Sequence, residues 1–153
     1  MKFSYGNFVQ RLVSGGTRLT EVESELLQQM VTSLPPTLRQ IVEEQFEAYN
    51  LVQRQVDGRA LNFYRQKDGL SNNMEGLPLL AMDVDEAPIV RVTATVSGDV
   101  EPLHATLTAV KGQVFCMALS RPVRARGRVK VLKIKQAWRS NFGKSNGGIG
   151  MGM

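Results

Sequence analysis

The chain has 153 residues, 42% of them hydrophobic, and a single cysteine, so it is long enough for one domain with its own core but cannot form an internal disulfide. Its formal net charge is +5, and no stretch approaches the roughly 20 apolar residues of a membrane-spanning helix. Residues 1–8 contain no continuous apolar run of the length that an export signal needs. We therefore expect a soluble protein of the cytoplasm, or of a particle assembled there, with no membrane partner.

Positive charge is concentrated in the last third of the chain. Residues 1–110 hold nine Lys/Arg and fourteen Asp/Glu, a net charge of −5, whereas residues 111–153 hold ten Lys/Arg and no acid, a net charge of +10. Such asymmetry indicates either a binding surface for an anionic partner or an acidic layer that neutralises a basic strand within one molecule. The sequence leaves both interpretations open.

Two amphipathic helices are predicted after a short segment of helical spacing at residues 8–13. In the first, residues 20–33, Thr20 and Glu23 have the spacing of a capping box. Two prolines end this helix, and Pro36 can open the next one because its missing N–H is not needed at that position. The second helix is predicted over residues 36–55, with an apolar face formed by Leu38, Ile41, Val42, Gln45, Tyr49, Val52 and Val56.

Strands are predicted in the rest of the chain. Residues 60–65 form a first strand, and residues 77–82 an edge strand or the start of one, because they contain Pro78. Residues 89–119 read as a meander of three strands joined by turns at 97–99 and 111–112. Residues 129–136 form the last strand, where a slip in alternation at Val131-Leu132 predicts a bulge or an edge position.

This order of elements predicts an α+β fold. Two N-terminal amphipathic helices should pack on one face of a mostly antiparallel sheet of about five to six strands. We expect residues 1–142 to form a single domain and residues 143–153 a basic, Gly-rich tail, since five of its eleven residues are glycine. The face of the meander toward the helices is predicted to contain Val90, Val92, Ala94, Val96, Leu103, Ala105, Leu107, Ala109, Val114, Cys116 and Ala118.

Covalent catalysis would require the single cysteine and the single histidine to meet. A two-residue turn at 111–112 sets a register in which Cys116 opposes Leu107 and His104 opposes Leu119. Opposed residues share a face, so this register puts Cys116 and His104 on opposite faces of the sheet. We therefore interpret Cys116 as a buried structural residue.

The acidic residues do not match a known metal-site pattern. Asp83, Asp85 and Glu86 lack the glycine and the later glutamate of a calcium loop, and Glu43, Glu44 and Glu47 lack a helical Glu-x-x-His. Gly143-Lys144-Ser145 lacks the preceding glycine spacing of a phosphate loop. We accordingly expect no metal, no cofactor and no enzymatic activity.

The strongest functional signal is a basic arm in which cations alternate with two aromatic residues. We define the basic arm as Arg121, Arg124, Arg126, Arg128, Lys130, Lys133, Lys135, Trp138, Arg139, Phe142 and Lys144. Such an arm suits docking onto an acidic protein surface, or sequence-tolerant binding of single-stranded nucleic acid through phosphate contacts and base stacking. It can also be structural, with Trp138 and Phe142 closing one end of the core and the cations protecting an edge strand.

The sequence-based hypothesis is a non-enzymatic protein-interaction module that docks through the basic arm to a protein partner or to neighbouring copies. Such a module would be a structural subunit of a larger assembly, for example a virion or a secretion-type particle. Two alternatives stay open: a sequence-tolerant single-stranded nucleic-acid-binding protein, and a small intracellular inhibitor or immunity protein. The latter rests only on the small size of the chain and its lack of catalytic motifs.

Overall fold

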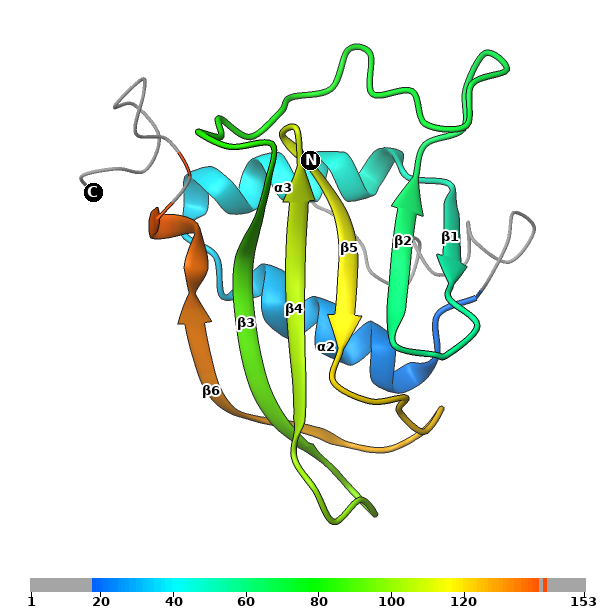
Figure 1. Ribbon diagram of the computed structural model, residues 1–153, viewed down its shortest axis with the longest axis vertical. Helices are drawn as coiled ribbons and strands as arrows, with labels where there is room; N and C mark the ends of the chain where they lie inside the picture. Colours follow the sequence, from blue (N-terminus) through cyan, green and yellow to red (C-terminus); the bar gives the residue numbers. More distant parts are fainter. Residues whose placement is uncertain (1–17, 141, 143–153) are drawn as a thin grey trace.

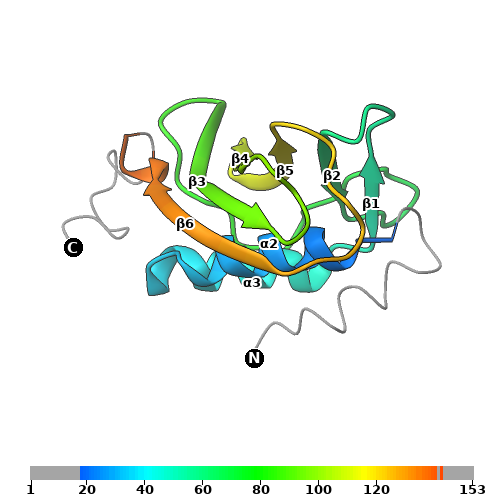
Figure 2. The same ribbon diagram turned by 90° about the horizontal axis from the view of Figure 1, so that it is seen from below.

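The structure is a computed structural model that describes residues 18–140 and 142. Two helices cover one face of a six-stranded antiparallel sheet and leave the other face open (Figures 1 and 2). The α+β prediction is therefore confirmed for this part of the chain. The segment at 8–13 and the Gly-rich tail lie outside the described residues.

The strands follow the order β1-β2-β5-β4-β3-β6 across the sheet, and all neighbours are antiparallel. The central three form the predicted meander, whereas β6 returns to pair with β3 at one edge. A short 3₁₀ helix, η2, follows β6. The elements are α2 (Glu21–Thr32), α3 (Pro36–Ala48), β1 (Leu51–Arg54), β2 (Ala60–Tyr64), β3 (Glu86–Val96), β4 (Leu103–Val110), β5 (Gln113–Leu119), β6 (Val129–Gln136) and η2 (Ala137–Ser140).

Local sequence signals determine where α2 begins. The Thr20 hydroxyl accepts a hydrogen bond from the backbone N–H of Glu23 at 3.1 Å, and the Glu23 carboxylate accepts one from the N–H of Thr20 at 2.9 Å. This is the predicted capping box, which satisfies two N–H groups that have no partner within the helix. Ser33 caps the other end, so the predicted bounds of this helix are confirmed.

The second helix ends earlier than predicted. It stops at Ala48, and residues 51–54, which helical periodicity assigned to its last turns, form strand β1 and pair with β2. Val52 is fully buried in this pairing, whereas Val56 is fully exposed. Asn50 fixes the change of direction through two hydrogen bonds with the backbone of Gln66, at 2.9 and 2.8 Å. The extension to residue 55 was therefore wrong, because pairing with a distant strand outweighed local periodicity.

The predicted strand at 77–82 is absent. Its backbone groups bond outside the sheet: the carbonyl of Pro78 accepts from the side chain of Gln45 at 2.8 Å, and the N–H of Leu80 donates to Gly112 at 2.9 Å. Only Met82 forms a β-bridge, with Phe142. This segment therefore crosses the end of the sheet as a connection.

The predicted core faces of β3 and β4 are confirmed, but that of β5 is not. Beyond the turn at 111–112, Ala109 opposes Val114, yet the next pair is Thr108 with Cys116. Phe115 is thus an extra residue, and this bulge reverses the faces of the residues that follow. Val114, Met117 and Leu119 face the core, whereas Cys116 and Ala118 lie half-buried on the open face.

Candidate interaction surface

Three lysines of β6 share the open face of the sheet. In the pairing of β6 with β3, Lys130 opposes Thr95, Lys133 opposes Thr93 and Lys135 opposes Arg91. Directly opposed residues share a face, and the other face of β3 carries the buried residues Val90, Val92, Ala94 and Val96. We call Arg91, Lys130, Lys133 and Lys135 the lysine strip.

A bulge in β6 makes this alignment possible. Lys133 opposes Thr93 and Val131 opposes Ala94, so Leu132 has no partner in the ladder. In a regular strand, residues three apart point to opposite faces. The extra residue therefore brings Lys130 onto the same face as Lys133 and Lys135. The slip in alternation at residues 131–132 predicted a bulge or an edge position, and the structure shows both.

Part of the lysine strip borders a shallow hollow of about 300 Å³. Among the residues that the structure describes, no acidic side chain lines this hollow. The hydroxyl of Thr93 lies 3.0 Å from Nδ1 of His104, and the other polar side chains of the lining are Arg91, Thr106, Lys133 and Lys135. This concentration of positive charge and hydroxyl groups suits the recognition of anionic groups. Sequence reasoning did not include Arg91, Thr93, His104 and Thr106, because their proximity to β6 depends on which strand β6 joins.

Arg121 and Arg124 are neutralised within the molecule. Nη1 of Arg121 and Nε of Arg124 each lie 3.0 Å from a carboxylate oxygen of Asp99. Arg121 also donates to the carbonyl of Glu101 at 2.7 Å. Since Asp99 belongs to the β3–β4 turn, these contacts fix the connection from β5 to β6 against that turn, so the two arginines have a structural role here.

The two aromatic residues of the basic arm belong to the core. Trp138 and Phe142 are 5% and 2% exposed, and the indole N–H of Trp138 donates to the side chain of Gln136 at 2.7 Å. Arg139 is exposed and covers part of this ring, with its guanidinium carbon 4.9 Å from the ring centroid of Trp138. These rings close the β6 end of the core and offer no surface on which bases can stack.

The other cations of the arm are exposed. The backbone around Arg126 and Arg128 is anchored, since the N–H of Arg128 donates to the Ser97 hydroxyl at 2.8 Å, but both side chains extend into solvent. Among the described residues, neither these arginines nor the lysine strip form an ion pair. Lys144 lies outside the described part of the chain.

The β5 bulge changes the relation between Cys116 and His104. Cys116 opposes Thr108 rather than Leu107, and His104 bonds to Ser120 rather than opposing Leu119. The pair therefore shares the open face, contrary to the predicted register. Their positions are still four residues apart along β4, roughly 13 Å at strand spacing, so they do not form a nucleophile pair. Burial raises the pKa of the Cys116 thiol, and the nearby Glu86 raises it further.

A second, larger hollow lies on the open face over β2, β5 and β4. It has a volume of about 660 Å³, and its lining is mostly neutral. Two of its side chains, Asn72 and Gln113, form reciprocal hydrogen bonds at 2.9 and 3.1 Å, so they satisfy each other. Glu86 and Lys111 also line it and offset each other in charge. The arrangement favours no charged ligand.

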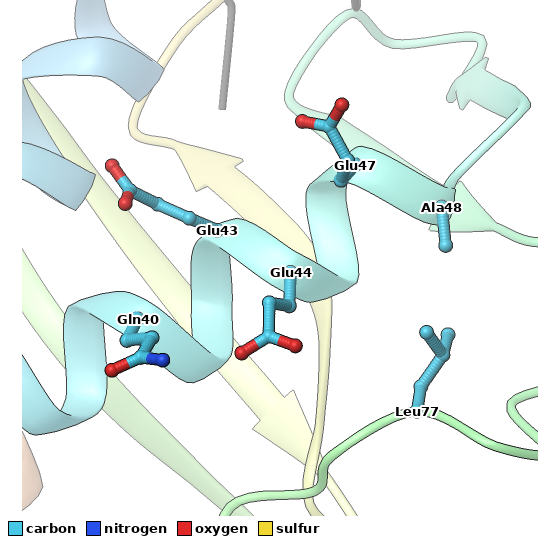
Figure 3. Close-up of a pocket in the computed structure, with 6 residues that line it drawn as sticks. All are labelled: Gln40, Glu43, Glu44, Glu47, Ala48 and Leu77. Atoms are coloured by element: carbon cyan, nitrogen blue, oxygen red, sulfur yellow. The ribbon is translucent and has the colours of Figure 1, made fainter. Parts of the chain in front are cut away.

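The glutamates of α3 line a groove on the opposite side of the molecule. Its volume is about 350 Å³, and Ala48 and Leu77 supply its apolar part. The carboxylates of Glu43 and Glu47 point away from that of Glu44 (Figure 3), so the three do not converge on one ion. Across residues 18–140 and 142, no three His, Cys, Asp or Glu residues gather in a metal-binding arrangement.

Neither described helix combines the length and the apolar character that a membrane crossing requires. Comparison of the chain with protein-family models, with curated proteins and with solved structures finds no match.

Proposed function

We propose that this protein is a non-enzymatic interaction subunit of a larger assembly, such as a virion or a secretion-type particle, and that it docks onto an acidic protein surface through the lysine strip. The bulge at Leu132 carries this proposal, because it gathers three lysines beside Arg91 on an open face where the described residues supply no acidic partner. Of the basic arm, we assign docking only to the exposed cations, because its aromatic residues are buried and two of its arginines pair with Asp99.

The surroundings of the lysines favour a protein partner. Leu132 is 55% exposed and lies between Lys130 and Lys133 along β6. Ile134 opposes Val92 on the other face of the sheet and is still 41% exposed at this edge. Protein interfaces combine apolar side chains with a charged rim, and complementary charge steers the encounter of the partners. Strand β6 also forms one edge of the sheet, so its outer backbone groups add a further means of docking.

Single-stranded nucleic acid is a second candidate, supported by one observation on the same face. Tyr64 and Phe115 form an edge-to-face pair with centroids 5.2 Å apart, and Phe115 lines the larger hollow. Cations and stacking rings on one sheet face are the elements of sequence-tolerant binding. Both rings are half-buried against each other, however, and strands β4 and β3 separate β5 from β6, so the protein partner is favoured.

The experiment is a measurement of native mass in cells that make the protein, after nuclease treatment. The wild-type chain should elute in complexes well above its own 17.0 kDa. The variant Lys130→Glu/Lys133→Glu should elute as free chain, and Arg59→Glu/Lys67→Glu, an equal charge change at exposed sites of another region, should behave as wild type. A wild-type chain that elutes alone would overturn the proposal, and a complex that nuclease destroys would favour nucleic acid.

A further inference from the structure

Charges of opposite sign lie on opposite sides of this molecule. On α3, Leu38, Val42 and Phe46 are buried toward the sheet, so the helical repeat puts Glu43, Glu44 and Glu47 on the side facing away from it. The lysine strip lies on the open face, and both helices lie across the sheet from that face (Figure 2). Each copy therefore presents two separate, oppositely charged surfaces.

The surface on α3 is a mixed acidic and apolar groove. We define the acidic groove as the hollow lined by Gln40, Glu43, Glu44, Glu47, Ala48 and Leu77. Gln40, Glu44 and Ala48 extend toward the side of the helix on which Leu77 lies (Figure 3). Glu43 is held by Arg39 at 3.1 Å, whereas Glu44 has no ion-pair partner among the described residues. The Oε2 atom of Glu47 is shielded from water and has no hydrogen-bond partner among the described residues.

Strand β6 has the complementary composition. The exposed apolar residue Leu132 lies between Lys130 and Lys133, and as the bulge residue it opposes nothing in β3. The strand thus offers one protruding apolar side chain flanked by two ammonium groups. The acidic groove offers an apolar patch beside carboxylates.

We infer that the partner of the lysine strip is a second copy of this chain, with β6 of one copy seated in the acidic groove of the next. Leu132 then contacts Leu77, while Lys130 and Lys133 lie beside Glu44 and Glu47. This inference rests on the proposed function, because it names the protein that the same strip binds. The two surfaces differ, so the contact is heterologous and repeats head to tail into a ring or an open filament.

Exchange of the charges tests this pairing with the full-length chain. The variant Lys130→Glu/Lys133→Glu carries acids on both surfaces, and Gln40→Lys/Glu44→Lys carries cations on both; all four positions are exposed. In sedimentation at about 50 mM salt, wild type should self-associate with increasing concentration. Each variant alone should be a monomer, with its dissociation constant raised at least about tenfold, and an equimolar mixture of the two should associate again.

Two measurements complete the test. The control Arg59→Glu/Lys67→Glu has the same net charge as the β6 variant and should self-associate like wild type. Carbodiimide cross-linking of a mixture of ¹⁵N-labelled and unlabelled wild type should join Lys130 or Lys133 of one copy to Glu44 or Glu47 of another.

Purified wild type that stays monomeric at every concentration, or an association that both charge variants retain, would overturn the inference. If purified wild type is monomeric but the cellular complex depends on Lys130 and Lys133, the proposed function stands and its partner is a different acidic protein.

Discussion

Replacement of Gln45 by leucine tests the polar connection between α3 and the sheet. Gln45 is fully buried, and its amide group donates to the carbonyls of Pro78 and Gly112 at 2.8 and 2.9 Å and accepts from the N–H of Val114 at 2.9 Å. The Gly112 carbonyl keeps a second donor, the N–H of Leu80. The substitution therefore leaves the buried N–H of Val114 and the part-buried carbonyl of Pro78 without these partners.

The size of the effect follows from those two groups. A buried group left unsatisfied costs about 1–3 kcal/mol, and the part-buried carbonyl costs less because water reaches it, so Gln45→Leu should lower the free energy of unfolding by about 2–3 kcal/mol after the modest gain from a more apolar side chain. Urea unfolding followed by circular dichroism measures this change, with an unaltered m-value showing that the same transition is observed. Gln40→Leu, on the exposed side of the same helix, should change stability by no more than about 0.5 kcal/mol. A loss below about 1 kcal/mol for Gln45→Leu would refute this reasoning.

Three further predictions concern pH, the β6 bulge and nucleic acid. Burial raises the pKa of Tyr49 far above its usual 10. Because the folded pKa is the higher one, Tyr49 adds no pH dependence to stability below about pH 10, and above it Tyr49 lowers the free energy of unfolding by about 1.4 kcal/mol per pH unit. Tyr49→Phe should remove this contribution from unfolding curves measured up to pH 11. Deletion of Leu132 and deletion of Lys133 should each leave a regular ladder and change the unfolding free energy by less than about 1.5 kcal/mol. Only the deletion of Leu132 keeps Lys133 opposite Thr93, so binding of an acidic probe such as poly-glutamate should survive this deletion and weaken about tenfold in the other. Equal losses of binding would contradict the assignment of Leu132 as the extra residue. The lysine strip supplies four cations, so labelled oligo-dT should bind with a log–log salt slope no steeper than about −2.8, and a slope of −4 or beyond would show that nucleic acid contacts more of the basic arm than the strip.

The elements that were predicted correctly are those whose signals are local. The capping box of α2 and the turn at 111–112 are each specified by a few neighbouring residues; Lys111 and Gly112 both adopt positive φ, 50° and 87°, as a tight hairpin turn requires. Strand β1, Leu51–Arg54, was missed because Val52 fits the predicted helical periodicity and the neighbouring residues were assigned to the helix with it. Only β2, a partner later in the chain, makes a strand the better solution for them.

The bulge in β6 could be predicted from the sequence, whereas the bulge in β5 could not. In β6, lysines alternate with apolar residues, so the slip at Leu132 is visible as a break in a polar pattern. In β5, the residues around Phe115 are nearly all apolar, so an extra residue leaves no break in polarity. The faces of Cys116 and Met117 were therefore assigned the wrong way round. The lysine strip could be predicted in part, but Arg91 could not be added to it without knowing that β6 joins β3.

The charge asymmetry of the chain has different consequences for the arginines near Asp99 and for the lysines of β6. Arg121 and Arg124 lie close enough to this carboxylate to pair with it, so the interpretation of the asymmetry as internal neutralisation holds for them. The lysines of β6 are separated from the glutamates of α3 by the sheet and by a helix about 10–12 Å thick. This separation exceeds the Debye length of about 8 Å at physiological salt, so the acidic layer leaves the lysine strip largely uncompensated. The same distance leaves each surface available to a neighbour, because a contact between copies brings these charges far closer than the fold does.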